Sequence, residues 1–188
     1  MEILEENKVL YLREVTQDDW SLLHEYASNE DVCKFQPWGP NTEEDSKFFI
    51  AQAIRDRNKR HRSRFVFAIV LKENNQVVGN IEMNITDWDG VGEIGFVIHH
   101  GHWGNGYAKQ AVCLMLKHSF DKCELHRVAA VSDPNNLASI RVLERVGMIK
   151  EGVLRKDLYI KGHWRDSVVF SLLENEWDDK QRKACDSN

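Results

Sequence analysis

Proline is scarce in this chain of 188 residues, which contains only three. With 42% hydrophobic residues and no low-complexity block, this scarcity excludes a disordered class and favours one folded domain with a sizeable core. No apolar run approaches the roughly 18 residues of a membrane span, which argues against membrane contact. The acidic stretch 1–6 lacks the basic and apolar parts of a signal peptide, so we expect a cytoplasmic protein.

Metal-binding and nucleic-acid-binding signatures are also missing. The four cysteines are too widely spaced for a C-x-x-C pair or a zinc ribbon: Cys33, Cys113, Cys123 and Cys185. The histidines at 99, 100 and 102 lack the helical spacing of a zinc site, so we expect no metal. The net charge of −5 argues against general nucleic-acid binding and is compatible with a cationic partner.

Hydrophobic periodicity predicts seven strands and four helices. The strands are expected at 8–15, 64–72, 76–85, 91–99, 127–132, 148–160 and 164–173. The helices are expected after Thr16, over 43–58, after Gly106, and from Leu137 to Gly147. A turn at 87–90 connects the third and fourth strands, and the helix between the fourth and fifth implies one parallel pair in an otherwise antiparallel sheet. We therefore expect a mixed α/β fold in a single domain, 1–188, whose tail from about 175 is peripheral.

The stretch 93–111 combines a strand, a short loop with two glycines and the start of a helix. Backbone N–H groups at such a helix N-terminus favour an anion such as a pyrophosphate. A third glycine at the dinucleotide-fingerprint position is missing, and no Gly-Lys-Ser/Thr follows, so neither a Rossmann nor a P-loop site is predicted. An ordinary strand-to-helix turn remains the alternative for this loop alone.

A second element follows about 30 residues later. Asn136 and Ser139 are three apart and share one face at the start of the helix that ends at Gly147. Plain helix capping is the alternative interpretation of these two residues, and it does not exclude a second role.

Together the two elements resemble the GNAT superfamily of acyl-CoA N-acyltransferases. The loop Trp103-Gly-Asn-Gly-Tyr-Ala108 is similar to the form found in the branch of bacterial ribosomal-protein N-acetyltransferases, although Trp103 takes the first position of the superfamily motif, where Arg or Gln is usual. Asn136-Leu-Ala-Ser139, the run from Leu143 to Gly152, with Met148 in place of the usual Phe, and the segment Leu158–Asp166 also look like that branch. The resemblance covers nearly the whole chain.

The resemblance implies a sheet that splays between the fourth and fifth strands and holds acetyl-CoA in the gap. The loop residues Trp103, Gly104, Asn105, Gly106, Tyr107 and Ala108 would then bind the pyrophosphate. Backbone groups around Val97, Ile98 and His99 would pair with the pantetheine arm, and Asn136 would bond that arm from the other side. A homodimer would be compatible with this branch.

Two residues are the expected catalytic groups. Glu93 corresponds in position to a catalytic glutamate of histone-type relatives and would accept the proton of the amine, with a structural carboxylate as the alternative. Glu82 on the neighbouring strand is the next candidate. The tyrosine that many relatives use near the thiol is replaced by Leu143, so Ser139 is the expected stabiliser of the departing thiolate.

The acceptor amine stays open between two classes. The branch resemblance and the acidic charge favour the α-amino group of a protein or peptide, in a cleft framed by the loop 35–40 and the hairpin 159–164. A polyamine or an aminoglycoside-like antibiotic suits the same features, and the acidic run 43–45 could bind a polycation or simply satisfy a helix N-terminus. A CoA-binding regulatory module without turnover is the third alternative.

Overall fold

A computed structural model describes residues 2–86 and 90–177 and shows one eight-stranded sheet with the strand order β1-β2-β3-β4-β5-β6-β8-β7. The strands are β1 (Ile3–Glu6), β2 (Leu10–Glu14), β3 (Arg64–Leu71), β4 (Val77–Thr86), β5 (Val91–Ile98), β6 (Arg127–Ser132), β7 (Ile149–Ile160) and β8 (His163–Leu173). The helices are α1 (Trp20–Ala27), α2 (Glu30–Cys33), α3 (Glu43–Arg57), α4 (Tyr107–Asp121) and α5 (Leu137–Arg145). Short 3-10 turns lie at Gln17–Asp19, His100–His102 and Glu174–Glu176.

All neighbouring strands are antiparallel except β5 and β6, which are parallel, as the helix between them predicts. Capping residues in the sequence explain where the helices that flank the site begin. Thr42 and Asp45 form a capping box that starts α3, and Gly106, in the left-handed conformation, starts α4. These helix starts fix where the loops before α3 and α4 end, beside the site.

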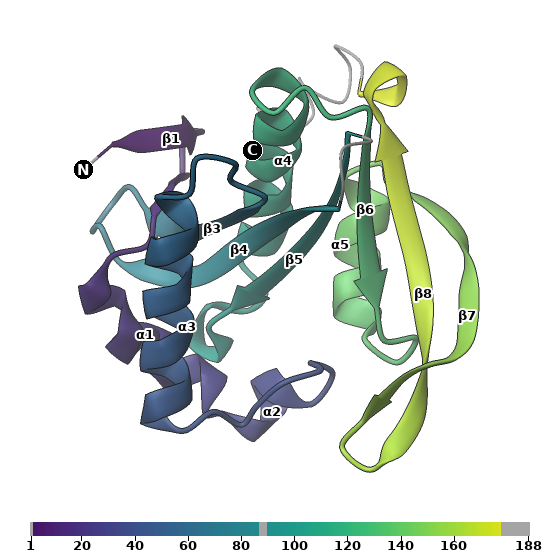
Figure 1. The fold of residues 1–188 in the computed structure, drawn as a ribbon, viewed down its shortest axis with the longest axis horizontal. Coiled ribbons are helices and arrows are strands. Elements are labelled where there is room, and N and C mark those ends of the chain that lie inside the picture. The colour runs from purple at the N-terminus through teal and green to yellow at the C-terminus, as the bar shows by residue number, and fades with distance from the viewer. Residues whose placement is uncertain (1, 87–89, 178–188) are drawn as a thin grey trace.

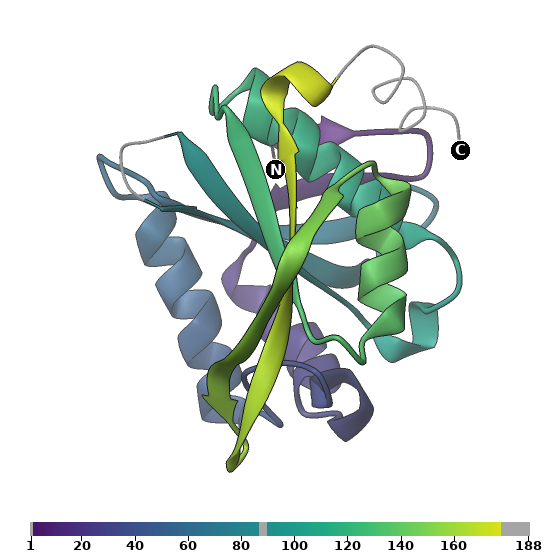
Figure 2. The ribbon, with the colours of Figure 1, turned by 90° about the vertical axis from the view of Figure 1, so that its right-hand side faces the viewer.

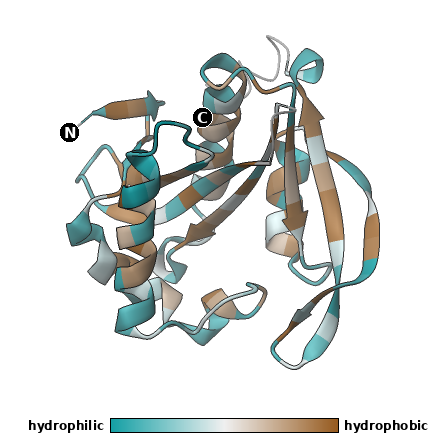
Figure 3. Ribbon diagram, viewed as in Figure 1, coloured by the Kyte–Doolittle hydropathy of each residue, from teal (hydrophilic) through white to brown (hydrophobic). Residues whose placement is uncertain are grey.

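Helices cover both faces of the left-hand part of the sheet (Figure 1). On one face, α1 and α3 pack over residues such as Val66, Ala68 and Val97 to form one core. On the other face, α4 packs over a larger core that includes Phe67 and Met83. Figure 3 shows the hydrophobic colour on these central strands, whereas β7 alternates between hydrophobic and hydrophilic residues.

The mixed α/β fold is confirmed, but the expected count of seven strands and four helices is wrong. The extra strand β1 has only four residues and almost no alternation, and its buried Glu5 pairs with Lys117 of α4 over 2.6 Å. The extra helix α2 is a single turn, capped by the side chain of Asn29. Elements this short form through contacts with distant residues, which periodicity does not reveal.

The tail from about 175 was expected to be peripheral, and this is wrong for its first part. Trp177 is 3% exposed and packs against Phe120 of α4, with 5.9 Å between ring centroids. Residues 178–188, and residues 87–89 of the turn expected at 87–90, lie outside the described residues. Of the helices in the described ranges, none has the length and hydrophobicity to cross a bilayer.

Candidate functional site

The site is built around a fork in the sheet between β5 and β6. The two strands are paired only over Val91–Glu93 and Arg127–Ala129. Beyond that point β5 stays paired with β4, and β6 with β8, so the strands diverge (Figure 1). Backbone groups on the inner edges of the fork lack a strand partner, and an extended ligand can satisfy them. The predicted splay between 91–99 and 127–132 is confirmed.

Strand pairing decides which peptide groups of β5 face the fork. The amide of His99 donates to the carbonyl of Val78 on β4 over 2.8 Å. In an antiparallel pair, such bonds direct the backbone of every second residue toward the neighbouring strand. The peptide groups of Val97 and His99 therefore face β4, whereas those of Phe96 and Ile98 face the fork. Phe96 was not predicted: alternation groups it with Ile98, but only the pairing with β4 shows that this set faces the fork.

The loop between β5 and α4 offers an open cradle of backbone amides. Gly104 and Gly106 have φ of +82° and +76°, and nothing would lie within 4 Å of a Cβ atom at either position. Gly106 caps α4 without a side chain, so the first amides of the helix, including those of Tyr107 and Ala108, have no intrahelical partner. This geometry fits a phosphate-sized anion.

Side chains of the loop hold the cradle in place. The indole N–H of Trp103 donates to the carbonyl of Ile98 over 2.8 Å, which ties the loop to the end of β5. The amide of Asn105 donates to the carbonyls of His102 and Trp103 over 3.2 and 3.4 Å. Trp103 and Asn105 thus shape the loop through their side chains.

Three histidines surround the start of this loop. The Nδ1 atom of His99 accepts from the amide of Gly101 over 3.0 Å, and its ring stacks on that of His100 at 4.3 Å. Burial, followed by the nearby His100 and His102, lowers the pKa of His99. The neutral ring keeps its acceptor for the Gly101 amide. In the part of the chain that the structure describes, no group of three His, Cys, Asp or Glu residues is arranged to hold a metal ion.

Glu93 lies at the vertex of the fork, in the last residue pair before the strands part. Its side chain is exposed and makes no hydrogen bond with the described residues. Desolvation by the surrounding protein, followed by the charges of Glu82 and Asp157, raises its pKa. A carboxylate with a raised pKa and free oxygens is suited to accept a proton.

Glu82 differs from Glu93 in that both of its oxygens are occupied. One oxygen accepts from Arg64 over 3.0 Å and the other from the amide of Asn84 over 3.1 Å. Arg64 also reaches Asp56 of α3 over 3.4 Å. This network braces β3, β4 and α3, which leaves Glu93 as the stronger candidate base.

Asn136 and Ser139 lie on the other side of the fork, at the start of α5. The side-chain oxygen of Asn136 accepts from the amide of Ser139 over 3.1 Å, so Asn136 is the helix cap. The side-chain N–H₂ of Asn136 and the hydroxyl of Ser139 have no hydrogen-bond partner among residues 2–86 and 90–177. The structure brings these two residues together and leaves both with unused polar groups. Glu93 belongs to the opposite strand.

A cavity of about 580 Å³ opens on the α1–α3 side of β4 and β5. Glu93, Gly95 and Val97 alternate along β5 and share one face, and the cavity includes the last two. Gly95 lies opposite Glu82 and leaves room between the strands and α3. The walls of the cavity carry aromatic rings and polar side chains: Trp38, Phe48, Phe49, Phe96, Gln36, Gln52, Asn80, Arg64, Glu82 and Asp45.

The predicted frame of this cavity is present in part. The loop 35–40 contributes Gln36, Trp38, Gly39 and Pro40 to the wall. The hairpin aromatics Tyr159 and Trp164 contact each other at 5.4 Å and are both more than half exposed, but they do not line the cavity. The acidic run 43–45 forms the start of α3, where Asp45 accepts from the backbone and hydroxyl of Thr42.

Two groups near the site were missed by sequence reasoning. Asp157 belongs to an irregular stretch of β7, where residues 155–157 lie opposite the single residue Asp166. Figure 2 shows β7, in green, crossing β8, in yellow, about half-way along the hairpin. Tyr26 of α1 donates to Asn80 over 2.8 Å and closes one wall of the cavity. Neither the bulge nor a bond between residues 54 apart leaves a signal in a single sequence.

The fork, the amide cradle and the helix cap agree with one family model, that of the acetyltransferase (GNAT) domain, which matches residues 10–149. The chain belongs to this family. Its uncharacterized N-acetyltransferase relative YnaD of Bacillus subtilis is 32% identical over 91% of this chain and 97% of the relative.

Solved structures show the same fold. The ribosomal-protein-S5-alanine acetyltransferase from Vibrio fischeri is 26% identical, covers 94% of this chain and 100% of its own, and superposes with a TM-score of 0.78. A spermidine N-acetyltransferase from Vibrio cholerae, solved with CoA and spermine, has a TM-score of 0.80 over 91% of this chain and 99% of its own. It is 20% identical, which supports the fold alone.

Proposed function

We propose that this chain acts as one domain and transfers the acetyl group of acetyl-CoA to the α-amino group of a protein or peptide. The observation that carries the proposal is the position of Glu93, at the vertex of the fork and on the same face of β5 as the cavity. An acetyl donor in the fork and an amine in the cavity would meet at this residue. The relative that modifies ribosomal protein S5 supports a protein acceptor.

The residues of the cofactor side would bind and orient the donor. The amides at the start of α4 and the glycine loop suit the pyrophosphate, and the peptide groups of Phe96 and Ile98 suit the amides of the pantetheine arm. The free N–H₂ of Asn136 can donate to the same arm. When bound, acetyl-CoA supplies an activated acyl group.

The remaining steps are proton movements. Glu93 accepts a proton from the acceptor ammonium, which exposes the nitrogen lone pair for attack on the thioester carbonyl. An α-amino group has a pKa of ~8, against ~10 for an alkyl amine. A carboxylate base can therefore deprotonate an α-ammonium group more easily than an alkyl ammonium group. The hydroxyl of Ser139 donates a hydrogen bond to the sulfur as the C–S bond breaks. Proximity in the ternary complex contributes much of the rest.

A small-molecule amine is the second candidate acceptor. The carboxylates of Glu82 and Asp157 lie near enough to Glu93 to raise its pKa, so this side of the site is acidic and favours a cation. A polyamine or an aminoglycoside would meet the same charges. The acidic run 43–45 adds less to this candidate than its charge suggests, because Asp45 caps α3 and Glu43 pairs with Lys47.

The test is a thiol-release assay with purified protein, acetyl-CoA and a panel of peptides with free and blocked N-termini, polyamines and aminoglycosides. We expect turnover with free N-termini and none with blocked ones. Turnover with polyamines alone would contradict a peptide acceptor and make a small-molecule amine the substrate. CoA binding by calorimetry without turnover of any amine would support a regulatory module instead, and no CoA binding would contradict the donor.

A further inference from the structure

A buried arginine of β8 joins two loops from opposite sides of the fork. Arg165 is 9% exposed, and its Nη1 atom donates to the carbonyl of Phe35 over 2.8 Å. Its Nε atom lies 3.8 Å from a carboxylate oxygen of Asp133, at the end of β6. Phe35 and Asp133 are 98 positions apart in the chain, so this side chain is a direct connection between them.

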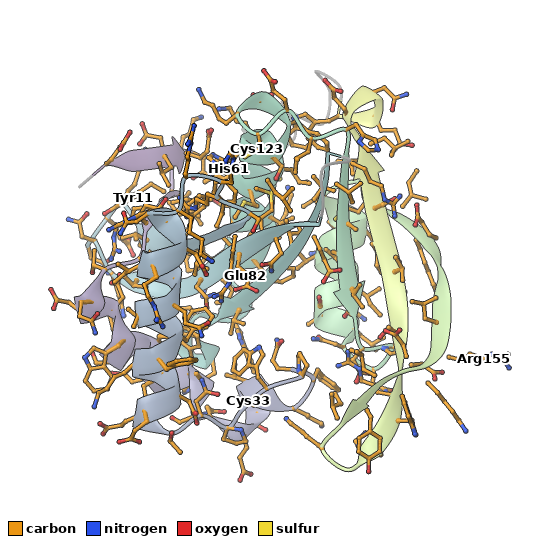
Figure 4. All side chains as sticks on the ribbon, in the orientation of Figure 1. Tyr11, Cys33, His61, Glu82, Cys123 and Arg155 are labelled. Carbon is orange, nitrogen blue, oxygen red and sulfur yellow. The ribbon has the colours of Figure 1, made fainter. Side chains whose placement is uncertain are left out.

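The Phe35 side of this connection leads to the acceptor cavity. Phe35 precedes Gln36 and Trp38, which line the cavity, by one and three residues. The ammonium of Lys161, at the tip of the β7–β8 hairpin, donates to the carbonyl of Cys33. The hairpin thus holds the segment 33–35 at two carbonyls. Figure 4 labels Cys33 at the foot of the fork, below Glu82.

The Asp133 side leads to the cofactor wall. One carboxylate oxygen of Asp133 accepts from the backbone and side-chain N–H groups of Asn135, over 2.8 and 3.0 Å. The carbonyl of Asp133 accepts from the amide of Asn136 over 2.9 Å. Asp133 therefore sets the turn that presents Asn136 and Ser139 to the fork.

Burying the charged side chain of Arg165 costs desolvation free energy. Its Nε atom is buried without a hydrogen-bond partner among the described residues, and its distance to Asp133 is too long for a direct hydrogen bond. A buried charge with an unpaired donor adds little stability compared with an apolar side chain. The guanidinium does have one property that an apolar side chain lacks: it donates a hydrogen bond to Phe35 while its charge faces the carboxylate of Asp133.

We propose that Arg165 is a positioning residue that couples the acceptor loop 33–41 to the cofactor-side turn 133–136, with Lys161 as a second anchor of the acceptor loop alone. The proposal rests on the proposed function. A bound donor that orders the turn would, through Arg165, also order the wall of the acceptor cavity. Binding of the two substrates would then be cooperative.

The test compares Arg165→Lys and Lys161→Met with the control Arg155→Met. Arg155 is an exposed cation of the same hairpin whose side chain points away from the fork (Figure 4). Losing one charge-assisted hydrogen bond to the loop predicts an increase of about tenfold in the acceptor KM of Lys161→Met, with an unchanged Kd for CoA. Arg165→Lys, which cannot span both partners, should raise the acceptor KM and the CoA Kd with a smaller change in kcat. The control should change neither.

Hydrogen exchange without ligands provides a readout that needs no turnover. Arg165→Lys should speed exchange at both 33–36 and 135–139, Lys161→Met at 33–36 only, and Arg155→Met at neither. Faster exchange throughout α4 and β3 would indicate general destabilisation and would overturn the proposal, as would wild-type exchange and wild-type KM values in Arg165→Lys. If the wild-type protein acetylates no amine, the proposed function fails, and the exchange pattern alone decides the role of Arg165.

Discussion

The two arms of the fork are built differently. The arm that ends in β5 has helices on both faces and a core in which Phe67, Ile69 and Ile81 are fully buried. The arm formed by β6, β8 and β7 is covered by α5 on one face, and β7 exposes Val153 and Leu154 by 45% and 50%. The cradle and Glu93 belong to the first arm, and the hairpin that anchors the acceptor loop belongs to the second. The proposed base and the cavity thus belong to the more buried arm, whereas the less buried arm carries Asn136, Ser139 and the hairpin that anchors the loop beside the cavity.

The largest difference between the arms should appear in stability. Phe67→Ala removes a fully buried ring and should lower the free energy of unfolding by about 3–5 kcal/mol. The matched change Leu154→Ala in β7 should cost less than about 0.5 kcal/mol. Urea denaturation measures both. Equal losses would mean that the two arms are equally packed in solution.

The next largest effect should come from the vertex. Glu93→Gln should lower kcat/KM by about 100-fold, because the base is lost while the fork is kept. In the wild-type protein the rate should rise with pH as Glu93 ionises, and that limb should disappear in the variant. Glu144→Gln, an exposed carboxylate of α5, is the control and should keep both the rate and the profile.

Stability separates this role from a structural one. Because the pKa of Glu93 is raised in the folded protein, the folded state holds this proton more tightly than the unfolded state. The ionised residue therefore destabilises the fold as the pH rises from the ordinary value through the raised one. Glu93→Gln should be at least as stable as the wild-type protein at neutral pH, and a marked loss of stability would argue for a structural carboxylate.

The cradle can be tested with two glycines of similar backbone. Gly106 and Gly162 both have positive φ, of +76° and +82°, and both have open surroundings for a Cβ atom. An alanine costs similar strain at each, but only Gly106 belongs to the cradle. Gly106→Ala should weaken acetyl-CoA binding about tenfold, as the loss of one charge-assisted hydrogen bond would, and Gly162→Ala less than twofold. Calorimetry would show equal affinities if the loop does not bind the pyrophosphate.

A smaller effect is expected on the other wall of the fork. Ser139→Ala should lower kcat by about fivefold, because a single neutral hydrogen bond to the leaving sulfur is lost. The affinity for CoA should not change, since the cap from Asn136 uses the backbone amide of residue 139. Single-turnover kinetics distinguish the two quantities, and a wild-type rate would remove Ser139 from the proposed chemistry.

The smallest effect concerns how the less buried arm is held together. Glu151 of β7 accepts from Arg127 of β6 at both oxygens, over 2.7 and 2.8 Å, and from Ser171 of β8. The Arg127 bonds, followed by Ser171, lower its pKa to about 2. This stabilisation is present above the ordinary carboxyl pKa and is lost as the pH falls toward 2. Because the pair is solvent-exposed, Glu151→Gln should cost less than about 1 kcal/mol at neutral pH, measured by urea denaturation at pH 7 and 3.

Sequence and structure agree where local rules decide the outcome. Alternation along 64–71 and 91–98, the glycines of the loop and the cap at Asn136 depend on neighbours within a few residues, and all appear where expected. The choice between Glu82 and Glu93 could not be made this way. It depends chiefly on Arg64, which reaches Glu82 only because β3 and β4 pair in one particular register, while Asn84, two residues along the same strand, occupies the other oxygen.

By itself the sequence determined the order of the main elements, the loop at 103–108 and the family resemblance, since periodicity, turns and motifs are local properties of the chain. Only the tertiary structure decided that pairing of β5 and β6 stops at Glu93, that Phe96 and Ile98 face the gap, and that Arg165 connects Phe35 with Asp133. These features arise from strand register and from contacts across long stretches of chain. A single sequence carries no pattern for such contacts, because the packing of the whole sheet decides whether they form and how much free energy they contribute.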